Sequence, residues 1–253
     1  PEIYLIGGIK MRASGILMHI SSLPSEYGIG TLGKDAYKFA DFLHEAKQSY
    51  WQILPVCPTS YGDSPYQSYS AYAGNPLLID LDMLIEDGLL NSDDHDLKVL
   101  LHKEHFADYA QLFSFKYVIL QKAAASFFTN TNSADMLVFK RFCSENGFWL
   151  DDYALFMSLK YLNRQVMWTK WDDDIRLREA EAVERYSTEL SDDILCWKFM
   201  QYEFFRQYFS LKAYANKNGI KIYGDMPIYV SMDSSDIWAN PELFMLDEDR
   251  RPI

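Results

Sequence analysis

Side chains able to bind a polyol are concentrated in one short loop, Tyr61-Gly62-Asp63-Ser64-Pro65-Tyr66-Gln67-Ser68. Gly62 and Pro65 interrupt both helices and β-ladders, so this segment cannot be a regular element. The residues before it, 51–56, read as a strand, and a polar loop at a strand end is a common place for a binding site. A tyrosine ring could stack on a sugar while its neighbours hydrogen-bond the hydroxyls. The candidates are Ser64, Tyr66, Gln67 and Ser68. On chemistry alone, an ordinary surface turn explains the loop equally well.

A second candidate is the carboxylate of Asp225, which follows an apolar segment, Ile220-Lys221-Ile222-Tyr223, that reads as a strand. Parallel α/β folds place ligands at the C-terminal ends of their strands, which makes Asp225 a candidate for ligand binding. A carboxylate that caps nearby backbone amides is the structural alternative. Asp233 lies a little further on and could pair with it. Ser234, next in the chain, is typical of a helix N-cap, which favours a structural role for that run.

Two patterns resemble cofactor or metal sites but lack the features that would support them. The run 28–33, Gly-Ile-Gly-Thr-Leu-Gly, matches the dinucleotide fingerprint. Seven residues separate it from the preceding strand, however, and no acidic residue ends the second strand. His102 and His105 are three residues apart, but Lys103 and Glu104 between them indicate a solvated helix face. The sequence therefore predicts no cofactor and no metal site.

The composition is that of a globular, acidic protein. With 253 residues, 49% of them hydrophobic, the chain can bury a substantial core. A formal charge of -12 repels phosphate backbones, which predicts no nucleic-acid binding and favours an uncharged substrate. No apolar run reaches about 18 residues, and no basic region followed by an apolar stretch opens the chain, so we predict neither a membrane span nor a signal peptide. Three cysteines without Cys-x-x-Cys spacing suit a reducing cytoplasm, which is the expected location.

The elements that would position these residues begin with a strand, a helix and a second strand. We expect strands over 14–20 and 50–56 and a helix over 34–47. The helix is predicted from apolar residues at three- and four-residue spacing. They are Ala36, Phe39, Ala40, Leu43 and Ala46. Two strands joined by one helix form a right-handed parallel unit, so the predicted fold class is α/β.

Beyond Leu84 the sequence becomes helical. We expect helices over 107–128, 134–146, 149–163 and 192–218. Gly147 and Gly219 are predicted to end the helices that precede them. A third strand then follows at 220–223. Three parallel strands are thus predicted for the whole chain.

Six ordered segments carry a further signal. They are Gly15-Ile16-Leu17-Met18-His19-Ile20-Ser21-Ser22-Leu23-Pro24, Trp51-Gln52-Ile53-Leu54-Pro55, Asp63-Ser64-Pro65-Tyr66-Gln67-Ser68, Gly74-Asn75-Pro76, Gly224-Asp225-Met226-Pro227-Ile228-Tyr229-Val230 and Ser235-Asp236-Ile237-Trp238-Ala239-Asn240-Pro241-Glu242-Leu243-Phe244. In this order the chain closely resembles the amylomaltase, or 4-α-glucanotransferase, family (glycoside hydrolase family 77). The helical middle contributes little to the resemblance.

The resemblance implies a (β/α)8 TIM barrel. This chain would be its N-terminal portion, incomplete and with a large helical insertion after the second strand. Residues 11–83 would supply the first barrel strands and helix with the substrate loop, 84–190 the helical insertion subdomain, and 191–253 the long helix, the third barrel strand and the following loop. Residues 1–10 are expected to be an extension, because Met11 would make a natural start. The remainder of the polypeptide would be needed to complete the barrel.

The same resemblance implies transfer of α-1,4-glucan segments between maltodextrins by a retaining double displacement, through a covalent glucosyl-enzyme. Tyr66 would stack on the sugar next to the cleaved bond, Ser64 would hydrogen-bond in the same donor site, and Asp225 would bind hydroxyls of that sugar. Further candidates for substrate binding are Gln67, Ser68 and Asn75.

No catalytic residue is expected within this chain. The nucleophile and the acid/base carboxylate would lie beyond Ile253, so these 253 residues alone are expected to be inactive. This expectation rejects Asp225 and Asp233 as a catalytic pair. The expected partner is a maltooligosaccharide or another α-1,4-glucan. Two alternatives stay open: a non-catalytic glucan-binding or regulatory module, and a related α-glucan hydrolase.

Overall fold

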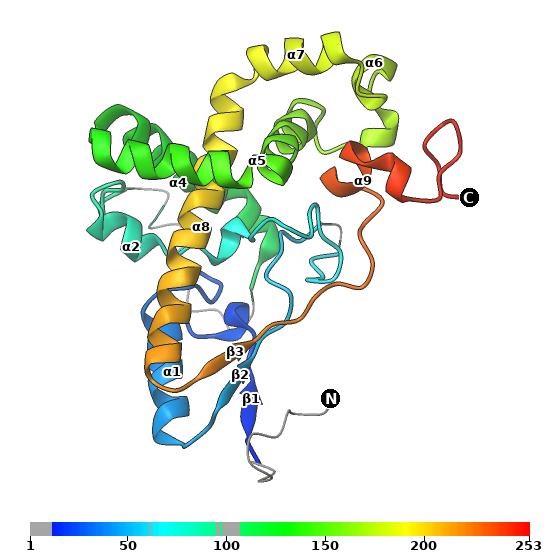
Figure 1. The fold of residues 1–253 in the computed structure, drawn as a ribbon. Coiled ribbons are helices and arrows are strands. Elements are labelled where there is room, and N and C mark those ends of the chain that lie inside the picture. Colours follow the sequence, from blue (N-terminus) through cyan, green and yellow to red (C-terminus); the bar gives the residue numbers. More distant parts are fainter. Residues whose placement is uncertain (1–11, 61, 95–96, 98–106) are drawn as a thin grey trace.

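The computed structural model describes residues 12–60, 62–94, 97 and 107–253 (Figure 1). The predictions for Tyr61, for His102 and His105 and for residues 1–10 therefore lie outside the described residues. A small sheet occupies one end of the molecule in Figure 1 and a layer of helices the other. The long helix α8 (Ser191–Lys217) runs between the two.

The sheet carries three parallel strands in the described part of the chain. They are β1 (Gly15–Leu17), β2 (Tyr50–Gln52) and β3 (Lys221–Tyr223), in the order β1-β2-β3. Tyr50 in the central strand lies opposite Gly15 on one side and Lys221 on the other. Parallel pairing confirms the predicted α/β class, and the carboxyl ends of all three strands meet at one edge of the sheet.

Each strand is shorter than the sequence predicts. The first ends at Leu17, because the chain turns into the 3-10 helix η1 (Ile20–Ser22) instead of continuing to pair. The second is predicted to reach Val56, but Pro55 has no N–H group to contribute to a ladder. The residues predicted as strand ends are therefore the first residues of the loops that build the site.

Helices are the other regular elements of the described chain. Helix α1 (Lys34–Glu45) connects β1 with β2 and buries Ala36, Ala40 and Leu43, as its spacing predicts. The others, in chain order, are η2 (Pro76–Leu78), α2 (Leu81–Glu86), α4 (Tyr109–Asn130), α5 (Ser133–Leu162), η3 (Trp168–Lys170), α6 (Asp173–Arg176), α7 (Ala180–Glu189), α8, α9 (Ser235–Ala239) and η4 (Pro241–Leu243). Helix α5 packs along α8, and together they carry much of the aromatic core.

Helix α5 continues through Gly147, where the sequence predicts a stop, so that prediction is wrong. Phe139 and Trp149 on either side of it both pack against aromatic rings of α8. Burying two such side chains contributes several times the cost of a glycine in a helix, which is about 1 kcal/mol. The other predicted stop is confirmed, because Gly219 follows α8 with a φ of 78°.

The glycine-rich run 28–33 packs tightly against the rest of the chain. A Cβ atom on Gly33 would lie 2.0 Å from Oδ2 of Asp80, so a larger residue would displace that side chain. The same carboxylate oxygen accepts a hydrogen bond of 2.6 Å from the Thr31 hydroxyl. The N-terminus of α1, where a dinucleotide-binding fold holds a phosphate, thus lies beside a carboxylate.

Apolar side chains are exposed along β3 and after it. Tyr223 within the strand is 57% exposed, Met226 81% and Ile228 90%. Within the described sheet β3 pairs with β2 alone, which leaves its other edge open. An open sheet edge followed by exposed apolar side chains is a surface on which another strand or chain can pair.

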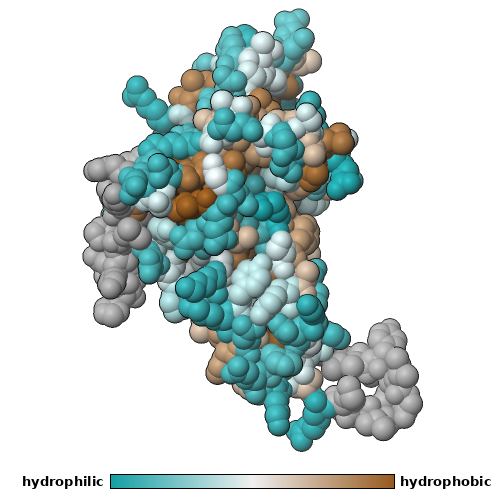
Figure 2. Space-filling view, turned by 90° about the vertical axis from the view of Figure 1, so that its left-hand side faces the viewer, coloured by the Kyte–Doolittle hydropathy of each residue, from teal (hydrophilic) through white to brown (hydrophobic). Residues whose placement is uncertain are grey.

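Figure 2 shows the molecule from another side, where the most hydrophobic residues gather over the helical half and the opposite half is mostly hydrophilic. Of the helices that the structure describes, none is both long and apolar enough to cross a membrane.

Candidate functional site

Two predicted site residues contact each other directly. The Tyr66 hydroxyl donates a hydrogen bond of 2.7 Å to Oδ2 of Asp225. Tyr66 belongs to the loop after β2, and Asp225 is the second residue after β3. Because β2 and β3 are neighbours in a parallel sheet, their following loops leave the same edge. The hydrogen bond to Asp225 raises the pKa of the Tyr66 phenol, and 46% of the tyrosine remains exposed.

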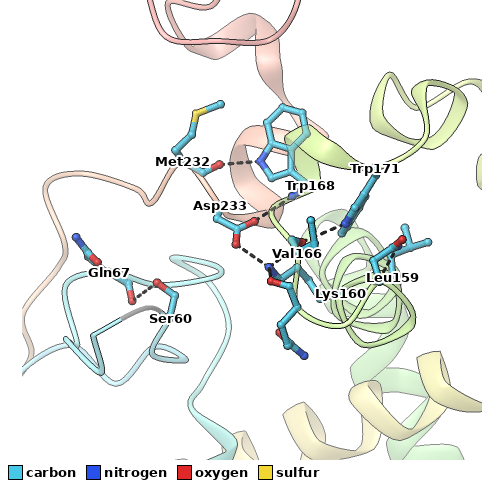
Figure 3. A network of polar contacts seen from close by, with 11 residues as sticks. Ser60, Gln67, Leu159, Lys160, Val166, Trp168, Trp171, Met232 and Asp233 are labelled. Atoms are coloured by element: carbon cyan, nitrogen blue, oxygen red, sulfur yellow. Dashed lines mark hydrogen bonds and ion pairs between the residues drawn. The ribbon is translucent and has the colours of Figure 1, made fainter.

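The loop that carries Tyr66 is closed by its own backbone. Thr59 and Ser68 form an antiparallel bridge, and the N–H and hydroxyl of Ser60 both donate to the Gln67 carbonyl, at 2.9 and 3.1 Å (Figure 3). Gly62 and Asp63 turn the chain with φ values of 83° and 55°. The tip of the loop, which includes Tyr66, is thus held by its two ends.

Ser64 lies inside this turn, next to Tyr66. Its hydroxyl accepts a hydrogen bond of 3.3 Å from the backbone N–H of Tyr66, and its carbonyl accepts one of 3.1 Å from the N–H of Gln67. A serine hydroxyl can still donate its proton while it accepts. Ser64 therefore shapes the loop and keeps a donor for a ligand.

The other three candidates differ in how far their side chains are committed to the protein. Ser68 is buried, where its hydroxyl donates to the Ser70 carbonyl at 2.7 Å and accepts from the Ser70 N–H at 3.1 Å. Asn75 is also buried and caps η2, because its Oδ1 accepts from the Leu77 N–H at 3.0 Å. Gln67 is exposed and lines the large cavity described next. Gln67 is thus the most accessible of the three.

A cavity of about 1190 Å³ opens beside the Tyr66 loop. Its walls come from four segments: the loop 59–69, helix α4, the end of α5 with the turn after it, and the segment that follows β3. Among the lining residues are Tyr66, Gln67, Phe113, Tyr117, Tyr161, Gln165, Met167 and Tyr229. Aromatic and apolar side chains with a few polar groups suit the alternating apolar faces and hydroxyl rims of a sugar chain.

Asp233 is held in a network of its own (Figure 3). Its Oδ2 accepts a hydrogen bond from Nζ of Lys160 at 2.7 Å, and its Oδ1 accepts one from the backbone N–H of Trp168 at 3.3 Å. The next residue, Ser234, caps α9 by accepting from the Ile237 N–H at 3.3 Å, as predicted. Through this ion pair Asp233 holds the segment after β3 against the end of α5.

A smaller cavity of about 150 Å³ lies under the loop. Its lining includes the candidate Asn75 together with His19, Thr59 and Asp63, which the sequence analysis did not propose as site residues. Among the described residues, His19 Nδ1 and Thr59 Oγ1 are buried polar atoms without a hydrogen-bond partner. Burial lowers the pKa of His19 to about 4, so its imidazole is neutral at pH 7. Burial also raises the pKa of the Asp63 carboxyl.

A signal for His19 was present in the sequence. It is the second residue after β1, just as Asp225 is the second residue after β3. A polar side chain at that position of a parallel strand faces the edge where ligands bind.

Metal and thiol chemistry find little support in the described part of the chain. No group of three or more His, Cys, Asp or Glu side chains there is arranged to hold a metal ion. Cys57, Cys143 and Cys196 are free thiols. Burial raises the pKa of Cys57 and of Cys143 to about 11, which keeps both thiols protonated at pH 7.

Comparison with known proteins gives one consistent family. The family model described as 4-alpha-glucanotransferase matches residues 18–250. A 4-alpha-glucanotransferase from Clostridium butyricum is 52% identical over 232 residues, which are 92% of this chain and 47% of that protein. One from Thermus thermophilus is 44% identical over 95% of this chain and 47% of its own length. The chain thus spans about half the length of the curated relatives it matches.

Solved structures agree with the sequence comparison. The amylomaltase from Streptococcus agalactiae in complex with acarbose superposes with a TM-score of 0.90 at 46% identity, over 96% of this chain and 48% of that one. The amylomaltase from Corynebacterium glutamicum superposes with a TM-score of 0.69 at 18% identity, over 92% of this chain and 32% of that one, and so shows the fold alone.

Proposed function

This chain belongs to the 4-alpha-glucanotransferase family, glycoside hydrolase family 77, and from that premise we propose that it forms the donor-side wall of a glucan cleft. The complete enzyme would transfer α-1,4-glucan segments between maltodextrins with retention of configuration. Within the 253 residues, the proposed roles are to bind and orient the sugar.

The contact between Tyr66 and Asp225 is the observation that carries this proposal. It joins an exposed aromatic ring to a carboxylate at the edge of a parallel sheet. The ring offers an apolar face for a pyranose to stack on, and a carboxylate with several lone-pair sites can accept a sugar hydroxyl as well as the phenol. Ser64 lies in the same turn, and its hydroxyl can still donate a hydrogen bond to a ligand. Gln67 is the further contact best placed to reach a ligand.

A relative that was solved with acarbose bound supports the proposal that this chain binds a sugar. The Streptococcus agalactiae amylomaltase was solved in complex with it, and that chain superposes closely on this one. We propose that the cavity beside Tyr66 takes a maltooligosaccharide, with no cofactor and no metal.

The bond-breaking groups are proposed to come from outside these residues. A retaining glycosidase mechanism needs a nucleophilic carboxylate and an acid/base carboxylate about 5 to 5.5 Å apart. The chain spans about half of its relatives, and the open edge of β3 with the exposed Met226 and Ile228 suits further parallel strands. We therefore propose that further strands complete a (β/α)8 barrel and carry both carboxylates.

Disproportionation of maltotriose tests the proposal and separates it from its rivals. The product of the whole gene and residues 1–253 would be incubated separately with maltotriose, and free glucose and longer maltodextrins followed together. A transferase forms both products with the whole gene product alone. A hydrolase releases glucose without longer chains. A binding module forms neither product, yet titration of either protein with maltotriose still shows binding.

A further inference from the structure

One buried lysine connects three walls of the large cavity. Lys160 lies in the last turn of α5, and its side chain is 0% exposed. Its Nζ donates to the carbonyls of Gln165 and Val166, at 2.9 and 3.1 Å, and to Oδ2 of Asp233 at 2.7 Å (Figure 3). An ammonium group has three N–H donors, and three acceptors surround this one.

The first wall held by Lys160 is the turn after α5. Arg164 and Gln165 both have positive φ values, 52° and 63°, in the left-handed region that side chains other than glycine rarely occupy. Such a conformation persists where the surroundings hold it, and here Lys160 binds two consecutive carbonyls. Trp171 adds a hydrogen bond of 3.2 Å from its Nε1 to the Val166 carbonyl. Through this turn Gln165 and Met167 reach the cavity.

The second wall is the segment that follows β3. Lys160 holds it through Asp233, and Trp168 holds it twice, through its backbone N–H to Asp233 and through its Nε1 to the Met232 carbonyl at 2.7 Å. The same segment carries Asp225 at its start and brings residues 229–233 to the cavity.

The third wall is the end of the substrate loop. Nζ of Lys160 lies 5.3 Å from the centroid of the Tyr69 ring, a cation–π distance. Tyr69 lines the cavity and follows Ser68, where the loop closes. One charged atom therefore contacts three chain segments that line the cavity.

We propose that Lys160 is a positioning residue that fixes the far walls of the glucan cleft and thereby sets how tightly long oligosaccharides bind. This rests on the proposed function. Lys160 acts through Gln165, Met167 and residues 229–233, which line the cavity, and we expect a longer chain to contact more of them than a short one does. Lys160 contacts neither Tyr66 nor Asp225 directly, although it anchors both of their segments further along the chain, so a short donor should be affected less than a long one.

Kinetics of Lys160→Met in the product of the whole gene test the proposal. Methionine has a similar length and no charge. We expect KM for maltoheptaose to rise about tenfold while kcat stays within about twofold, and KM for maltotriose to stay within about twofold, because the lost interactions affect binding along the cleft rather than the transition state. Asp233→Asn keeps one acceptor oxygen, which can replace one of the two carboxylate oxygens that accept from Lys160 and Trp168, and should give a smaller rise for maltoheptaose. Lys198→Met is the matched control, because Lys198 pairs with Asp151 between α5 and α8 and does not line the cavity.

A spectroscopic readout reports on the walls independently of activity. The indole N–H groups of Trp168 and Trp171 donate to Met232 and Val166, one in each anchored segment. In a ¹H–¹⁵N spectrum their signals should shift in Lys160→Met, while the signal of Trp51, which donates to Met18 at the sheet, should stay in place.

Four results would overturn the inference, three kinetic and one spectroscopic. The first is a folded Lys160→Met variant with unchanged KM for maltoheptaose, and the second is an equal rise in KM for both donors. The third result concerns the case in which Lys160→Met does not fold. The test is then made with Asp233→Asn, and an unchanged KM of that variant for maltoheptaose contradicts the proposal. If the unsubstituted protein transfers no glucan at all, the proposed function fails, and unshifted Trp168 and Trp171 signals would separately refute the positioning role.

Discussion

The Tyr66 phenol and the Asp225 carboxylate lie 2.7 Å apart although 159 residues separate them in the chain. The helices that lie between β2 and β3 in the chain do not separate these two residues in space, because the two strands pair directly. A pyranose presents an apolar face and a rim of hydroxyls, and this pair of residues presents a ring and a carboxylate. Their contact is the structural basis for the proposed sugar site.

Loss of the Tyr66 hydroxyl should weaken the site less than loss of the ring. Tyr66→Phe keeps the stacking face but frees Asp225, and we expect about a three- to tenfold loss in kcat/KM for maltotriose. Tyr66→Ala removes both features and should lose at least tenfold more. The measurement is steady-state transfer by the product of the whole gene. Tyr72→Phe, at an exposed tyrosine that does not line the large cavity, is the control, and equal effects of the two Tyr66 variants would contradict stacking.

Two glycines should respond to alanine with opposite signs. Gly147 lies inside α5, and a Cβ there meets the Asp151 side chain, with Oδ2 at 3.3 Å and Cγ at 4.0 Å. Gly147→Ala should raise the free energy of unfolding by about 0.5–1 kcal/mol, because alanine is the better helix former. Gly33→Ala should lower it by about 1–3 kcal/mol, because its Cβ would overlap the Asp80 carboxylate. Urea unfolding of both variants measures this, and a stabilising Gly33→Ala would refute the packing described for the run 28–33.

The buried Lys116 should make stability depend on pH. Its Nζ donates to the Leu77 carbonyl at 2.6 Å, and burial lowers its pKa to about 7, although Asp80 acts in the opposite direction. Between pH 7 and about 10.4 the unfolded lysine binds a proton that the folded one has released, so stability rises with pH in that window by up to about 1.4 kcal/mol per unit. Below pH 7 both states are protonated and this slope vanishes.

Lys116→Met isolates that slope from other groups that titrate in the same range. Urea unfolding of both proteins at pH 7, 8 and 9 should show the difference in stability between them changing with pH, with the variant gaining most at pH 7. The same difference at all three values would mean that Lys116 stays charged in the fold.

Residues 1–253 on their own should associate through the segment after β3. Met226 and Ile228 are almost fully exposed, and β3 has an open edge in the described sheet. We expect light scattering to show concentration-dependent association, which the double substitution Met226→Ser and Ile228→Ser reduces. A stable monomer with a cooperative melting transition would argue against the incomplete-barrel account.

The parallel sheet and the helices α1, α4, α5 and α8 were predictable because their signals are local, whereas α2, α6 and α7 were not predicted. Apolar spacing placed α1, and strand-like runs placed β1, β2 and β3, although Pro55 and the turn at 20–22 shortened them. The helix end predicted at Gly147 was wrong because the packing of α5 on α8 outweighs the low helix propensity of one glycine.

Part of the candidate site could likewise be predicted from local signals in the sequence, and part could not. Tyr66, Ser64 and Asp225 were candidates from their chemistry and their places after strands, and the resemblance supplied the role expected of each, while chemistry alone left the loop as open to a surface turn as to a site. Lys160 carried no signal, because a lysine in a helical pattern normally points to water, and its burial depends on Asp233, 73 residues away. Asp63 became a candidate only through the cavity beneath its loop, whereas His19 had a signal in its place two residues after β1 that the sequence analysis did not use.

The most direct test is a crystal structure of the product of the whole gene with a bound maltooligosaccharide. The account predicts a glucose ring stacked on Tyr66, with a hydroxyl of the same ring within about 3 Å of an Asp225 carboxylate oxygen. An oligosaccharide bound in the active cleft with neither residue in contact would contradict it.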